Sequence, residues 1–163
     1  MEKFIPEFKY APVDFDPFAS EAIDRTVPST EAQREVFIAS QMGKEASCAY
    51  NESVSLDLKG TLDVAALDAG IGQLVERHEA LRGCMSADGT RVIVQERADV
   101  PLQHVDLSTL SPQQRKSELE RMAEKDMTTP FDLLNGPVFR ASLIKLAPEE
   151  HPLRLTGHHV LVD

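Results

Sequence analysis

The residues best suited to chemistry lie at the carboxyl-terminal end, in Gly157-His158-His159-Val160-Leu161-Val162-Asp163. Imidazole is the side chain that most readily transfers a proton near neutral pH. Neighbouring residues of a strand point to opposite faces of a sheet. We therefore expect one histidine to face a reacting centre and the other to pack inside. Asp163 braces this site if the chain turns back toward it.

The same spacing disfavours a metal site. Histidine and aspartate are common metal ligands, but His158 and His159 would have to reach one ion from opposite faces of the strand. We therefore expect no metal. Two histidines at a strand end also fit a purely structural role, and the pair alone does not separate the two interpretations.

Arg77-His78-Glu79-Ala80-Leu81-Arg82 is the second dense cluster. It is not a zinc-protease motif, because Arg82 stands where that motif needs a histidine. The simpler interpretation is the charged end of a helix, with Arg82 near the negative end of the helix dipole. The functional interpretation pairs an arginine with a buried carboxylate, since a guanidinium stays charged when it loses water.

Other chemistries find no support in the sequence. Gly70 and Gly72 lack the third glycine of a dinucleotide fingerprint, since Val75 stands in its place. No phosphate loop or Gly-x-Ser-x-Gly elbow occurs. Cys84 lies in a predicted strand beside an apolar residue, so we expect a small core residue rather than a nucleophile.

The elements that position these residues mix helices and strands without strict alternation. Thr30 with Gln33, and Ser111 with Gln114, predict capping boxes at two helix starts. Asp88-Gly89 predicts a hairpin turn. Helices are expected from residue 30 to 43, from 63 to 79 and from 111 through Met127, before the break at Pro130. Strands are expected at 54–58, 81–85, 91–95, 100–105, 138–146 and 153–160. Gly70 and Gly72 predict close packing on the middle helix. The expected fold is an α+β, two-layer sandwich with helices on a mixed, largely antiparallel sheet.

Composition limits the class of protein. The chain has 163 residues, with 42% hydrophobic and 27% charged residues, which is typical of one globular domain or one lobe of a larger one. Its net charge of −10 argues against a surface built to bind nucleic acid or an anionic membrane. Two cysteines exclude a disulfide scaffold, and no apolar run approaches the roughly 20 residues of a membrane span. Without a signal peptide at the first residues, we expect a cytoplasmic protein.

Residues 1–27 are expected to form an extended leader or upstream linker. Three prolines punctuate this segment, and five aromatic residues are spread through it, which is too many for a free linker. We expect it to lie against a neighbouring surface.

Several motifs in the same order resemble the N-terminal lobe of a nonribosomal peptide synthetase condensation domain, over residues 28–163. Ser29 to Phe37 resembles the opening Ser-x-Ala-Gln motif, with one extra residue. Residues 77–82 match Arg-His-Glu-x-Leu-Arg, and residues 130–141 resemble Pro-Phe-Asp-Leu…Gly-Pro-Leu-x-Arg. His158-His159-x-x-x-Asp163 matches His-His-x-x-x-Asp-Gly up to its last glycine. Residues 39–53 are similar to the subgroup from mixed polyketide–peptide assembly lines.

The resemblance implies a lobe similar to chloramphenicol acetyltransferase. Two such lobes form a V-shaped domain with a tunnel between them. A donor acyl or peptidyl thioester and an acceptor aminoacyl thioester then enter from opposite faces, each on the phosphopantetheine arm of a carrier domain, and an amide forms. The arms are substrates, and no tightly bound cofactor is implied. The expected partners are the donor and acceptor carriers and the second lobe, with self-association through an exposed apolar face.

The resemblance also assigns roles. His159 is at the family's catalytic position, and His158, Asp163 and Arg82 are implied to support the site structurally, with Asp163 paired to Arg82. Gly157 stands where many relatives carry a larger residue. Because the second lobe is absent from the sequence, we expect this fragment alone to be inactive in condensation.

Three alternatives stay open. An epimerisation domain shares the histidine motif, although the Arg-His-Glu-x-Leu-Arg form favours condensation. A non-catalytic module that docks carriers, and a coenzyme A-dependent acyltransferase built as a trimer of single lobes, belong to other functional classes.

Overall fold

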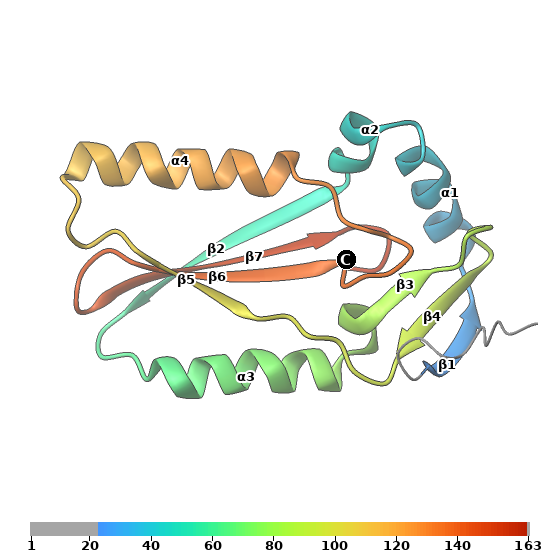
Figure 1. Cartoon of the computed structure of the whole chain (residues 1–163), viewed down its shortest axis with the longest axis horizontal. Helices are drawn as coiled ribbons and strands as arrows, with labels where there is room; N and C mark the ends of the chain where they lie inside the picture. Colours follow the sequence, from blue (N-terminus) through green and yellow to red (C-terminus); the bar gives the residue numbers. More distant parts are fainter. Residues whose placement is uncertain (1–22, 163) are drawn as a thin grey trace, which may run out of the picture.

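The computed structural model describes residues 23–162, which form two sheets (Figure 1). The larger sheet has the order β2-β7-β6-β5, and the smaller one β1-β4-β3. All neighbouring strands are antiparallel except β5 and β6, which are parallel. The strands are β1 (Ile23–Pro28), β2 (Asn51–Lys59), β3 (Gly83–Met85), β4 (Arg91–Gln95), β5 (Leu102–Asp106), β6 (Phe139–Lys145) and β7 (Glu150–His158).

Helices cover both faces of the larger sheet. Figure 1 shows α3 (Val64–Arg77) on one face and α4 (Pro112–Thr128) on the other, with α1 (Glu31–Ser40) and α2 (Lys44–Cys48) near one end. The mixed, largely antiparallel fold with helices packed on the sheet is confirmed, and the larger sheet carries helices on both of its faces. The reason lies in β6, where Leu143 and Ile144 are neighbours on opposite faces and both are buried.

The face under α3 holds the main apolar core. Ile71 and Val75 of this helix pack with Phe139 and Leu153, among other sheet residues. The close packing expected at Gly70 and Gly72 is wrong, because a Cβ added at either would meet nothing within 4 Å. Both glycines lie on the exposed side of α3.

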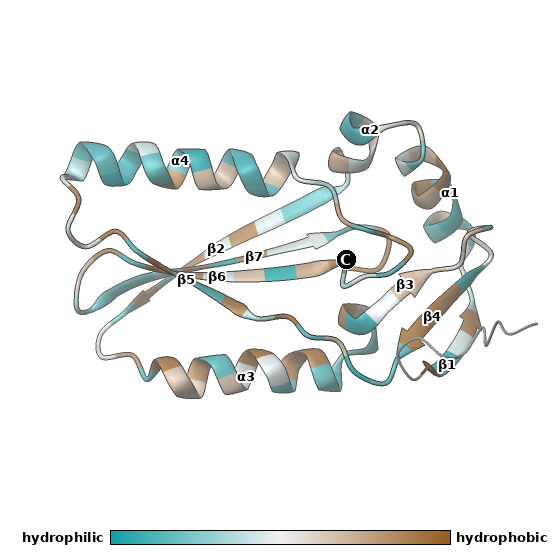
Figure 2. Ribbon diagram, in the orientation of Figure 1, coloured by the Kyte–Doolittle hydropathy of each residue, from teal (hydrophilic) through white to brown (hydrophobic). Residues whose placement is uncertain are grey.

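The helix α4 docks with little apolar burial. Ser111 caps it in the predicted capping box with Gln114. Within Pro112–Thr128 no residue is fully buried, and Figure 2 shows the helix largely hydrophilic along its length. Leu119 and Met122 are half-buried toward the sheet, whereas Met127 is 40% exposed.

A second core joins the smaller sheet to α1. Phe37 of α1 packs with Met85, Val92 and Val160, among others. The predicted capping box at Thr30 is present. The predicted hairpin turn is present as well, with Gly89 at φ +68°.

Two expectations on the outer strands need correction. The strand over 54–58 is not half-buried, because Val54 and Leu56 are 50% and 45% exposed. β2 is an edge strand, and only its far end, at Leu58, reaches the core under α3. Residues 23–27, expected within the leader, belong to β1 and pair with β4, while residues 1–22 lie outside the described part of the chain.

Within residues 23–162, no helix combines the length and the apolar character needed to cross a membrane.

Candidate active site

The two histidines stand where β7 ends and the chain turns. In the pairing of β2 with β7, Asn51 lies opposite His158 and Glu52 lies opposite Gly157. The backbone N–H of His159 donates to the carbonyl of Tyr50 over 2.9 Å. After the strand, the N–H groups of Leu161 and Val162 both point to the His158 carbonyl, at 3.2 and 3.1 Å. These bonds fix the backbone from which both rings extend.

His158 is a fully buried ring with both nitrogens in use. The N–H of Val160 donates to its Nδ1 over 3.2 Å, and its Nε2 lies 3.2 Å from the Ser47 carbonyl oxygen. A backbone amide can only donate and a carbonyl can only accept. His158 is therefore neutral, with its hydrogen on Nε2. The rings of Tyr50 and Phe131 lie beside it, with centroids 6.0 and 6.2 Å away.

This environment opposes protonation of His158. Burial lowers the pKa of His158 below its ordinary value, and the neighbouring His159 lowers it further, while the Ser47 carbonyl acts in the opposite direction. A proton added at Nδ1 would also break the bond from Val160. We conclude that His158 ties the end of β7 to α2 and is poorly suited to exchange protons.

His159 lies on the other side, as strand alternation predicts, with its side chain 39% exposed. Its Nδ1 is buried and lies 3.5 Å from Oε1 of Glu52. The exposure therefore falls on the remaining atoms of the side chain. His159 is the histidine of the pair that an incoming molecule can reach.

The segment that follows the histidines packs tightly over Gly157. A Cβ at this position would come within 3.0 Å of both Cβ and Cγ1 of Val162. At Gly83 a Cβ would come within 2.9 Å of Cδ1 of Leu161. The two glycines thus leave room for two larger residues of the turn. The resemblance singled out Gly157, but not the residues that fill the space above it.

Arg82 is buried, with 9% of its surface exposed, at the end of the short 3₁₀ helix η1 (Glu79–Arg82). Its Nη1 lies 3.5 Å from Oδ2 of Asp24 and also donates to the carbonyl of Gln95. Glu79 of the same motif pairs with Arg25. The motif thus binds strand β1 at two adjacent residues. Asp163, the expected partner of Arg82, lies outside the described residues, so that pairing stays a prediction.

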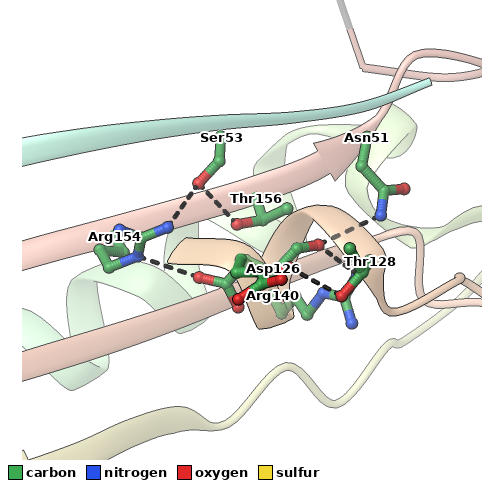
Figure 3. Close-up of polar contacts among 8 residues, drawn as sticks. Asn51, Ser53, Asp126, Thr128, Arg140, Arg154 and Thr156 are labelled. Carbon is green, nitrogen blue, oxygen red and sulfur yellow. Dashed lines mark hydrogen bonds and ion pairs between the residues drawn. The ribbon is translucent and has the colours of Figure 1, made fainter. Parts of the chain in front are cut away.

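A polar network holds the end of α4 to the sheet (Figure 3). Nε of Arg154 donates to Oδ2 of Asp126 over 2.9 Å, and the two side chains are only 12% and 17% exposed. Nδ2 of Asn51 and Nη2 of Arg140 both donate to the carbonyl of Thr129, at 2.9 and 2.6 Å.

This network sets the path of the segment that touches His158. Thr129 is the C-cap of α4, and Phe131 follows two residues later. The Arg140 guanidinium lies 3.8 Å from the centroid of the Phe131 ring, and Phe131 meets His158 edge-on.

Asp132, the residue after Phe131, is held as a carboxylate by its own turn. The side chain of Asn135 and the N–H groups of Leu134 and Asn135 lower the pKa of Asp132. Asp132 therefore stabilises the turn of this motif as a carboxylate.

Sequence reasoning missed Glu52, Asp24 and the Asn51–Asp126–Arg154 network. All three depend on which strands pair and in which register, and no local spacing encodes that. For Glu52 a partial signal existed, since it lies two residues before the first residue of the predicted alternating strand, Val54, and so shares its face.

Two other chemistries considered for the sequence are a metal site and a cysteine nucleophile. Within residues 23–162, no group of three or more His, Cys, Asp or Glu side chains is placed to hold a metal ion. Cys84 is 3% exposed in β3, which agrees with the expected small core residue.

Comparison with known proteins gives one family. Residues 23–163 match the condensation domain family. A chondramide synthase of Chondromyces crocatus is 32% identical over 139 residues, covering 84% of this chain and 4% of the relative. Tyrocidine synthase 3 of Brevibacillus parabrevis is 36% identical over 136 residues, covering 83% of this chain and 2% of the relative. The chain therefore spans only a few per cent of these relatives.

Two solved structures resemble the fold of this chain. The first condensation domain of the calcium-dependent antibiotic synthetase, in complex with a substrate analogue, gives a TM-score of 0.73 at 25% identity, over 86% of this chain and 34% of that one. The X-domain from teicoplanin biosynthesis, in complex with OxyB, gives 0.69 at 31% identity, over 85% of this chain and 29% of that one.

Proposed function

Because the chain belongs to the condensation domain family, we propose that it supplies the histidine-bearing lobe of a domain that forms amide bonds in nonribosomal peptide biosynthesis. Its relatives include synthases of chondramide and of tyrocidine. The observation that carries the proposal is the contrast within the histidine pair. His158 is 0% exposed with both nitrogens bound, whereas the His159 side chain is 39% exposed.

The reaction joins two carrier-bound thioesters. The amine of the aminoacyl acceptor attacks the carbonyl carbon of the donor acyl or peptidyl thioester, a C–N bond forms, and the C–S bond breaks. The amine loses one proton, and the departing phosphopantetheine sulfur gains one. The phosphopantetheine arms are thus substrates that the donor and acceptor carriers deliver.

His159 hydrogen-bonds the acceptor amine and orients it toward the carbonyl. A free amine is already a good nucleophile, so positioning contributes more than activation. An acceptor nitrogen on the exposed ring also receives the amine proton as the tetrahedral species forms. His158, Arg82 and Asp163 support this geometry structurally.

The test uses this chain joined to the remainder of its domain. Donor and acceptor carriers are loaded, mixed with the protein, and followed by intact mass, with His159→Ala alongside. Transfer of the acyl group to the acceptor, lost in the variant, supports the proposal. A change of configuration at the loaded residue without transfer would instead identify an epimerase.

A non-catalytic docking module is the second candidate. The similarity to the X-domain, a structure solved in complex with another protein, favours it. Binding of both carriers without transfer, and with no effect of His159→Ala, would select this candidate.

A further inference from the structure

One acidic side chain stands against the exposed histidine, and the sequence motifs assign it no role in the site. Oε1 of Glu52 lies 3.5 Å from Nδ1 of His159. Resting on the proposed role of His159, we propose that Glu52 is a positioning residue that keeps the hydrogen of the neutral His159 ring on Nδ1. Nε2 is then the acceptor that the ring offers to the incoming amine.

The strand register places the two groups together. Glu52 lies opposite Gly157 in the β2–β7 pair, so both point to the same face. His159 follows Gly157 by two residues and returns to that side. The backbone bond from His159 to Tyr50 joins the same two segments just beyond this pair. Glu52 therefore lies on the same side of the sheet as the His159 ring, with Oε1 3.5 Å from Nδ1.

Gly157 places no side chain opposite Glu52. Side chains opposite each other in an antiparallel pair stand about 4.5–5.5 Å apart at Cβ and compete for the same space. Glycine presents no side chain to Glu52. Val162 packs against Gly157 from the following turn, within 3.0 Å of where a Cβ would be. The glycine thus lets the turn that carries Val162 pack beside the Glu52–His159 pair.

The tautomer follows from donor and acceptor chemistry. A carboxylate only accepts, so it favours the ring form with its hydrogen on Nδ1, and Nε2 then carries a lone pair. The distance of 3.5 Å exceeds a hydrogen bond. Such contacts are often long before a substrate binds, and the Glu52 side chain is 63% exposed, which leaves it able to move closer. The same carboxylate stabilises the imidazolium that forms when Nε2 takes a proton.

The neighbouring histidine provides an internal reference. His158 holds its hydrogen on Nε2, because Val160 donates to Nδ1. The pair should therefore show opposite tautomers, so that a single spectrum compares the two rings under the same conditions.

The first experiment reads the tautomers directly. The chain is labelled with ¹⁵N-histidine, and long-range ¹H–¹⁵N spectra are recorded above pH 8. We expect a donor-type Nδ1 for His159 and an acceptor-type Nδ1 for His158. Glu52→Val should move His159 to the Nε2-hydrogen form and leave His158 unchanged, whereas Glu52→Gln, which keeps an acceptor oxygen, should retain the original tautomer. Ser55→Val, at another exposed position of β2, should change neither.

The second experiment measures condensation by the chain joined to the rest of its domain. Glu52→Val should lower kcat about 10-fold with KM unchanged, less than the roughly 10²–10⁴-fold of a full acid–base group, because Glu52 acts through another residue. An unchanged His159 tautomer and unchanged kcat in Glu52→Val would overturn the inference, even with His159→Ala inactive. Full activity of His159→Ala would instead overturn the proposed function.

Discussion

Replacing Gly157 by alanine tests how tightly the turn after the histidines is packed. The new Cβ would lie 3.0 Å from Cβ and Cγ1 of Val162 and 3.1 Å from its Cγ2. The Cβ of valine is fixed to the backbone, and its χ1 is stiff, so a rotamer change does not relieve the contact. The turn itself must move, against the two bonds from Leu161 and Val162 to the His158 carbonyl.

The cost follows from two opposing effects. Overpacking a well-filled site costs about 1–3 kcal/mol. Alanine gains back about 0.4–1 kcal/mol, because it restricts the unfolded chain. The net loss in the free energy of unfolding is about 1–2 kcal/mol. With a urea m-value of about 2 kcal/mol/M, the unfolding midpoint should fall by roughly 0.5–1 M.

The assay is urea unfolding followed by circular dichroism, with Gly70→Ala as the matched control. At Gly70 a Cβ meets nothing within 4 Å, so this helix substitution should stabilise the protein by about 0.5–1 kcal/mol. Val162→Ala removes two of the three contacting carbons, so in that background Gly157→Ala should cost about 1 kcal/mol less. An equal cost in both backgrounds, or a gain like that of Gly70→Ala, would refute the close packing.

The remaining predictions concern His158, the Arg154–Asp126 pair and the α4 cap. Because burial lowers the pKa of His158 from 6.5, its contribution to stability should be complete above that pH and decrease as the pH falls below it. Urea unfolding at pH 7.5 and 5.5 should show this loss, and His158→Gln should reduce it. Asp126→Ala should lower the free energy of unfolding by about 3–5 kcal/mol, because it leaves Arg154 buried without its partner. The double variant Asp126→Leu with Arg154→Met should recover most of this loss. Equal losses in the single and the double variant would contradict the pairing. Ser111→Ala should cost about 0.5–2 kcal/mol through the lost cap, measured as a lower melting temperature.

Local chemistry made much of the fold predictable. The capping boxes at Thr30 and Ser111 and the Asp88-Gly89 turn each depend on residues within three or four positions, and all are present. The strand over 91–95 was predicted with its observed bounds. Burial was predicted less well, because it depends on where a strand lies in the sheet. Val54 and Leu56 alternate like half-buried residues, but their strand lies at an edge where the core does not reach.

The candidate site likewise has one part that local sequence predicts and another part that it does not. The histidine pair is a local signal, and strand alternation alone predicts one buried and one accessible ring. Glu52 and Asp24 come to the site from strands that are distant in sequence, and their contacts follow from register. A shift of β2 by one residue would turn Glu52 to the other face. Such contacts are visible only once the strands are paired.

The two faces of the larger sheet hold the histidines by different means. On the α4 side, a largely polar network sets the path of residues 126–131, and Phe131 then closes the pocket around His158. On the opposite side Glu52 meets His159 beside Gly157. Because hydrogen bonds are directional, the polar side fixes His158 in one orientation. The exposed glutamate, by contrast, leaves His159 able to adjust as a substrate approaches. The last residue of β7 is thus a rigid anchor, and the residue that follows it carries an adjustable ring.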